Sequence, residues 1–94
     1  LGLEAHITEV FTPDVLLPAC GQGVLGLELR ADDSVVHALL SPLFDAETAR
    51  CMDVERRVNA ALGGSCRTPM GIYCHTTENA GLALRVRVLA ANGK

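Results

Sequence analysis

The sequence predicts a small α+β fragment with a crossover strand, a short helix, one long helix and an antiparallel hairpin of a small helix-covered sheet. Apolar residues recur every three to four positions between residues 51 and 62, which is the period of an amphipathic helix. Apolar and polar residues alternate along 82–90, which is the period of a strand. The chain has 94 residues, 49% hydrophobic and 20% charged, a composition that suits one modest core and excludes a disordered chain.

The first third of the chain is expected to contain two strands joined by an irregular loop. Residues 5–11 alternate weakly and predict a strand, which Pro13 ends because proline lacks an amide donor. Gly21-Gln22-Gly23 is too rich in glycine for the interior of an element, so it predicts a loop. The alternation over 26–30 predicts the second strand.

Two helices are expected next. Asp32 and Asp33 can cap a short helix over 34–40, which the following Pro42 ends. A longer helix begins at Asp45. Its apolar stripe consists of Cys51, Val54, Val58 and Ala61, and Gly63-Gly64 ends it with a left-handed cap.

A hairpin is predicted to follow the long helix. Its strands cover about 71–76 and 82–90, and the turn lies at 78–81. In the second strand, the apolar residues share one face and Arg85 and Arg87 lie on the other. A further hairpin signal at Asn92-Gly93 has no strand after it, so we expect this chain to be truncated.

Charge and cysteine content narrow the class of protein. Eight basic and eleven acidic residues give a net charge of −3, which argues against a nucleic-acid-binding module. No apolar run is long enough to span a membrane, and no secretory leader is expected. The four cysteines are therefore expected to be reduced thiols of a cytoplasmic protein.

Several candidate sites lack the context that their chemistry needs. Residues 21–26 satisfy G-x-G-x-x-G, but a proline-containing loop precedes them and a predicted strand follows, the reverse of a nucleotide site. The potential zinc ligands are Cys51, Cys66, Cys74 and His75, but zinc binding is not expected because the sequence contains no C-x₂-C pair. A hydrolase site that pairs Cys66 with His37 or His75 has no supporting motif.

Cys66 differs from the other cysteines because of its position. It lies in a loop between the end of the long helix and the first hairpin strand, where a side chain can reach into a cleft. The negative end of the helix dipole disfavours a thiolate there, whereas the neighbouring Arg67 favours one. The residues alone leave two interpretations open: a functional thiol and an inert one.

Two stretches together resemble the porphobilinogen deaminase (hydroxymethylbilane synthase) family in its C-terminal part. Residues 55–71, ERRVNAALGGSCRTPMG, are similar to the family's cofactor-attachment motif, and residues 17–28, LPACGQGVLGLE, to its Pro-Ala-x-Gly-Gln-Gly segment. One departure is Ser65, where many members have glycine before the motif cysteine. With the connecting residues, the resemblance covers nearly the whole chain.

The resemblance implies an enzyme of tetrapyrrole (porphyrin and haem) biosynthesis. Members of the family condense four porphobilinogen molecules to hydroxymethylbilane and release ammonia at each step. They build the growing polypyrrole on a dipyrromethane cofactor joined by a thioether to the motif cysteine, here Cys66. Gln22 and Gly23 would face the carboxylate groups of cofactor and substrate, and Arg67 is a weaker candidate. The family's catalytic carboxylate lies outside this sequence, so no catalytic and no metal-binding residue is expected here.

The resemblance also implies a division of the chain. Residues 1–17 would leave the family's second domain, 18–31 would cross back to the first, 32–44 would be a linker with the short helix, and 45–94 would begin the C-terminal cofactor-attachment domain. We expect the remainder of the enzyme chain to be its partner. Without that remainder, these 94 residues should be inactive and should associate with one another. The alternative is a non-catalytic α+β interaction module in which Cys66 is a bystander.

Overall fold

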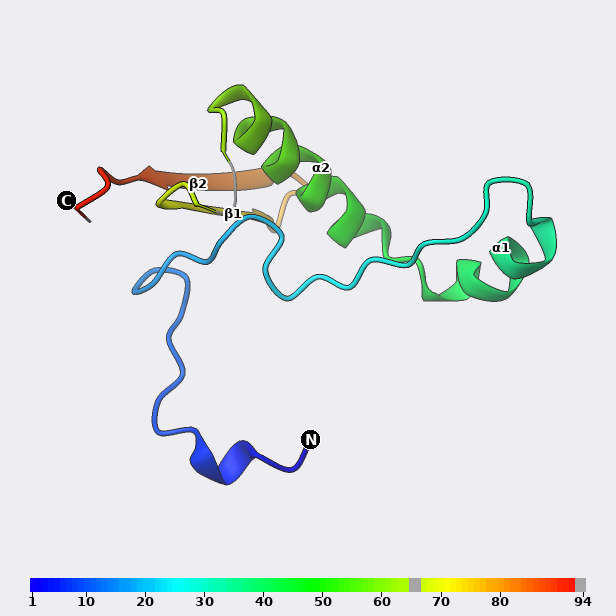
Figure 1. Ribbon diagram of the computed structural model, residues 1–94, viewed down its shortest axis with the longest axis horizontal. Helices are drawn as coiled ribbons and strands as arrows, with labels where there is room; N and C mark the ends of the chain where they lie inside the picture. Colours follow the sequence, from blue (N-terminus) through cyan, green and yellow to red (C-terminus); the bar gives the residue numbers. More distant parts are fainter. Residues whose placement is uncertain (65–66, 93–94) are drawn as a thin grey trace.

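The computed structural model describes residues 1–64 and 67–92. Its two helices and one two-stranded antiparallel sheet confirm the predicted α+β class (Figure 1). The elements in chain order are the 3₁₀ turn η1 (Glu4–His6), helix α1 (Ser34–Leu40), the 3₁₀ turn η2 (Ser41–Leu43), helix α2 (Ala46–Ala61) and the strands β1 (Met70–Thr76) and β2 (Leu82–Val88). Figure 1 shows α2 beside the hairpin, with α1 and the N-terminal segment standing away from them.

Helix α2 forms where both of its ends have local signals. The Asp45 side chain accepts hydrogen bonds from the backbone N–H groups of Glu47 and Thr48, which satisfies two otherwise unpaired donors. At the other end Gly63 has φ of +68°, its N–H donates to Ala60 O at 3.1 Å, and Gly64 N–H donates to the Asn59 carbonyl at 2.8 Å. These paired bonds form a Schellman motif, the left-handed cap that the double glycine predicts.

The hairpin has the predicted turn and both predicted strands, but β2 ends at Val88, two residues before the expected end at 90. Its register pairs Met70 with Val88 and Thr76 with Leu82. Thr77 N–H donates to Gly81 O at 2.9 Å and closes the turn, and Ala80 has the left-handed φ of +60°. The hairpin is therefore continuous from its first pair to its turn.

The core lies between α2 and β1. Among the described residues, the fully buried apolar side chains are Ile72 and Cys74, which are 1% and 4% exposed. Their cross-strand partners Val86 and Leu84 share the same face but are 39% and 41% exposed. Helix α2 thus covers the β1 half of this face and leaves the β2 half open.

Two predicted strands in the first third are wrong. Residues 5–11 begin in η1 and continue as irregular chain, and 26–30 is not paired in any sheet. A strand needs a hydrogen-bonding neighbour, and in the described part of the chain β1 and β2 pair with each other. The expected crossover strand is therefore an unpaired segment here.

The N-terminal third reaches the hairpin at two points. Pro18 O accepts a hydrogen bond from Ile72 N–H at 2.8 Å, so this residue lies against the edge of β1 that β2 does not occupy. Arg85 of β2 forms an exposed ion pair with Asp14. The radius of gyration, 16.3 Å, nevertheless exceeds the value of about 12 Å expected for a compact domain of this length.

The thiol of Cys74 lies in the core. Burial, together with a hydrogen bond to the neighbouring thiol of Cys51, raises the pKa of this thiol to about 11 from its ordinary value of 9.0. Cys20, Cys51 and Cys74 are all free thiols.

The C-terminal cap of α2 gives a stability prediction. Gly63→Ala should lower the free energy of unfolding of the complete natural chain by about 1 kcal/mol, because alanine is strained at positive φ. Gly26→Ala is the control, since nothing lies within 4 Å of the added methyl group and its φ is not positive. Urea unfolding measures both, and equal stability of the two variants would contradict the cap.

The buried thiol gives a pH prediction. Because the folded chain holds the Cys74 proton more tightly than the unfolded chain, stability is fully present below pH 9 and should fall as the pH rises from about 9 toward about 11. Urea unfolding at pH 8 and pH 10.5 should show a larger loss for the wild type than for Cys74→Ala. The same loss in both chains would count against the raised pKa.

Candidate functional site

A tight turn at residues 19–24 contains the residues that the sequence nominates for ligand contact. Gln22 N–H donates to Ala19 O at 3.1 Å, and Val24 N–H donates to Gly21 O at 3.2 Å. The Gln22 side chain closes the turn as well, because its Oε1 accepts from Ala19 N–H at 2.9 Å. We call residues 19–24 the Gln22 turn.

Glu55 of α2 fastens the Gln22 turn to the hairpin. Its Oε1 accepts from Gly21 N–H at 2.9 Å, and its Oε2 accepts from Cys74 N–H at 3.0 Å. Glu55 is only 6% exposed, and among the described residues no other charged side chain is buried. The turn, α2 and β1 therefore meet at one carboxylate.

Sequence reasoning did not single out Glu55, although a signal was present. The residue directly follows Val54 and stands four positions after Cys51, so it lies within the apolar face of α2. A charged residue in such a stripe must find partners when the stripe is buried. Here the partners are two backbone N–H groups from distant segments.

Gln22 and Gly23 are both exposed, as a ligand-contacting pair requires. The bond from Ala19 N–H occupies the amide oxygen of Gln22, which leaves its NH₂ group as the donor for a ligand. Gly23 has φ of +83°, a conformation that side chains other than glycine rarely adopt, and nothing lies within 4 Å of where a Cβ would stand. A ligand can therefore approach this backbone closely.

Cys66 lies outside the described residues, as does Ser65. The described flanks are both anchored. Gly64 closes the cap of α2, and Pro69 O accepts a hydrogen bond from Leu89 N–H at 2.9 Å beside the start of β1. The expected attachment residue thus belongs to a short connection between α2 and the hairpin.

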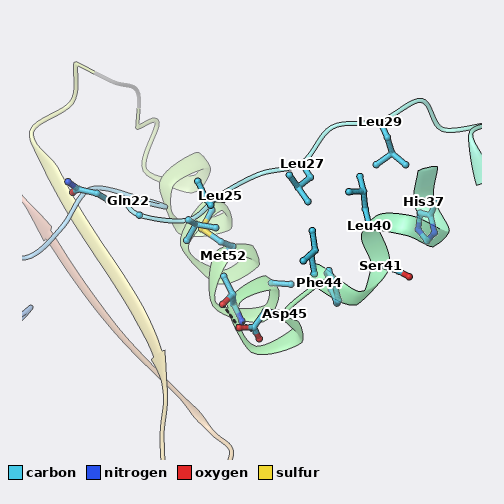
Figure 2. A pocket seen from close by; sticks show the side chains of 15 residues that line it. Gln22, Leu25, Leu27, Leu29, His37, Leu40, Ser41, Phe44, Asp45 and Met52 are labelled. Atoms are coloured by element: carbon cyan, nitrogen blue, oxygen red, sulfur yellow. Dashed lines mark hydrogen bonds between the residues drawn. The ribbon is translucent and has the colours of Figure 1, made fainter. Parts of the chain in front are cut away.

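An open groove of about 600 Å³ lies between the Gln22 turn, the unpaired segment after it, and the helices α1 and α2. Figure 2 shows Leu25, Leu27 and Leu29 on one side and Leu40 and Phe44 on the other. The apolar residues that alternate over 26–30 thus lie on one side of the segment and face the groove, although the segment is not a strand.

The chemistry of this groove is apolar with one acid. Its acid is Asp45 and its histidine is His37, and none of the lysines and arginines that the structure describes lines it. A group rich in carboxylates would lose its hydration there without gaining a cation. The groove itself therefore does not suit an acidic cofactor, whereas the exposed donors of the Gln22 turn at its end do.

The described residues form neither a metal-binding cluster nor a membrane-spanning helix. In the described ranges, 1–64 and 67–92, no group of three or more His, Cys, Asp or Glu side chains is arranged to hold a metal ion. His75 stacks on Tyr73 with ring centroids 5.4 Å apart. None of the helices that the structure describes has the length and apolar character needed to cross a membrane.

Comparisons with known proteins give one consistent family. Residues 1–38 match the family model described as porphobilinogen deaminase, dipyromethane cofactor binding domain. No solved structure matches the chain significantly.

The curated relatives match almost the whole chain. The porphobilinogen deaminase of Sorangium cellulosum (strain So ce56) is 52% identical over 91 residues, which are 97% of this chain and 29% of the relative. That of Legionella pneumophila (strain Philadelphia 1) is 45% identical over 93 residues, 99% of this chain and 30% of the relative. That of Roseiflexus sp. (strain RS-1) is 45% identical over 94 residues, 100% of this chain and 31% of the relative.

The chain thus spans about 30% of the length of the curated relatives it matches. These matches confirm the resemblance that the residues at 17–28 and 55–71 indicate. Over this span, the chain is similar to a fragment of the proteins of the porphobilinogen deaminase family.

Proposed function

We propose that this segment works within an enzyme of tetrapyrrole biosynthesis that condenses four porphobilinogen molecules to hydroxymethylbilane and releases ammonia. The observation that carries the proposal is the 45–52% identity, over 91–94 residues, to three proteins named porphobilinogen deaminase. The matched span covers 97–100% of the chain and therefore contains both motifs.

Cys66 is the proposed attachment point of a dipyrromethane cofactor. The Cys66 sulfur would hold the cofactor through a thioether, a linkage that resists hydrolysis and reduction. Support comes from the motif around Cys66 and from the anchored flanks at Gly64 and Pro69. When bound, the dipyrromethane supplies the pyrrole end to which substrate units are joined.

Gln22 and Gly23 are the proposed contacts for carboxylate groups of cofactor and substrate. The NH₂ group of Gln22 can donate hydrogen bonds to a carboxylate oxygen. Gly23 gives access to the backbone because nothing obstructs its Cβ position. Both residues bind and orient in this scheme, and neither transfers a proton.

These 94 residues are proposed to need the remainder of the enzyme chain. Large apolar side chains stay exposed, among them Leu25, Phe44 and Val88 at 92%, 70% and 56% exposure. Such surfaces favour binding to a complementary part of the protein or to a second copy. Alone, the segment should associate with itself and should form no hydroxymethylbilane.

Cofactor attachment is testable by mass. In the complete natural chain, peptide mapping should find a two-pyrrole adduct on the peptide that contains Cys66. Cys66→Ser should remove both the adduct and hydroxymethylbilane formation, because a hydroxyl is a far weaker nucleophile than a thiol. Cys51→Ala is the control and should keep both. An unmodified Cys66 in an active enzyme would refute the assignment.

The role of Gln22 is testable by a change that preserves the turn. Gln22→Glu keeps an oxygen for the Ala19 N–H bond but replaces the NH₂ donor with a second oxygen and adds a negative charge. The KM for porphobilinogen should rise about tenfold or more, since losing one charge-assisted bond costs at least about 1.5 kcal/mol.

The control for this charge is Asn79→Asp, which adds the same charge in the exposed hairpin turn. It should leave the KM within about twofold, because exposed charges far from a ligand are screened by salt. An unchanged KM in Gln22→Glu would remove Gln22 from the site.

A further inference from the structure

The feature that the proposed function does not use is the buried carboxylate of Glu55. Each of its oxygens accepts one backbone N–H, from Gly21 at 2.9 Å and from Cys74 at 3.0 Å. These partners stand 34 residues before it and 19 residues after it in the sequence. One side chain therefore joins three segments that local structure does not connect.

A carboxylate is suited to this place because of its hydrogen-bonding capacity. It offers acceptors on both oxygens, whereas an amide of the same shape has one acceptor and one donor group. With a glutamine at this position, one of the two backbone N–H groups would face an NH₂ group instead of an oxygen. One bond must then be lost.

Gly21 is the neighbour of Gln22, so the Glu55 bond acts next to the proposed ligand contacts. The turn also rests on α2 through Met52, whose Cε lies 2.9 Å from where a Cβ on Gly21 would stand. The exposed Gln22 and Gly23 thus project from a base that is fixed to α2. The C-terminal end of that helix leads into the connection that contains Cys66.

We infer that Glu55 is a positioning residue, which holds the Gln22 turn in fixed register with the α2–β1 unit and thereby sets the affinity for the substrate's carboxylate groups. This inference rests on the proposed function. It assigns Glu55 no contact with the substrate and no proton transfer. Its loss should consequently weaken binding more than it slows the chemical steps.

The test compares Glu55→Gln with Asp53→Asn in the complete natural enzyme chain. Both changes remove one negative charge from α2, but Asp53 is exposed, and the contact that the described chain gives it is an i,i+4 ion pair with Arg57 at 3.0 Å. Glu55→Gln should raise the KM for porphobilinogen about tenfold, as expected for one lost charge-assisted hydrogen bond, with kcat within about twofold. Asp53→Asn should change neither by more than about twofold.

A double variant separates positioning from a general loss of stability. If Glu55 acts through the Gln22 turn, Glu55→Gln and Gln22→Glu together should raise the KM by less than the product of their single effects. A full product, or a fall in kcat at unchanged KM, would overturn the inference.

Amide hydrogen exchange tests the positioning without the activity. The Gly21 N–H should exchange at least about tenfold faster in Glu55→Ala than in Asp53→Asn, because alanine offers no acceptor to either backbone N–H. Unchanged exchange would overturn the inference even in an active enzyme. A wild-type chain that consumes no porphobilinogen would instead refute the proposed function, and the exchange of Gly21 would still decide whether Glu55 holds the turn.

Discussion

The structure depends on a buried carboxylate that two distant backbone amides share. Without Glu55, the N–H groups of Gly21 and Cys74 would lose their acceptor in or beside the core, and an unpaired buried donor costs about 1–3 kcal/mol. Because the fully buried apolar side chains of the described chain are Ile72 and Cys74, a cost of this size is large here. These two hydrogen bonds therefore contribute a larger share of the stability here than they would in a domain with a larger apolar core.

Two open apolar regions border helix α2 and the hairpin. One is the groove between the segment after the Gln22 turn and the helices α1 and α2, and the other is the β2 half of the sheet face. Both regions consist of side chains whose periodicity is that of buried elements. Each region is therefore an apolar face that no helix or strand of the described chain covers.

The elements that the sequence predicts correctly have their signals nearby in the chain. Asp45 caps α2, Gly63 ends it, and alternation with a turn defines the hairpin. The strand expected over 26–30 depends on a partner that local pattern cannot supply. Glu55 was missed for a similar reason, since its partners lie 34 and 19 residues away. Gln22 and Gly23 are placed together in an exposed turn, while the roles of these residues and of Cys66 stay predictions.

The two attachments of the N-terminal third to the hairpin differ in physical kind. Asp14 and Arg85 form an ion pair between exposed side chains, whereas Pro18 O accepts a backbone hydrogen bond from Ile72. Close by, Gly21 N–H donates to the buried carboxylate of Glu55 on α2. Mobile ions screen the first kind of contact and hardly affect the second. Raising the ionic strength should therefore loosen the chain before Leu17 and leave the Gln22 turn in place, so that residues near 17 divide a salt-sensitive segment from a salt-resistant one.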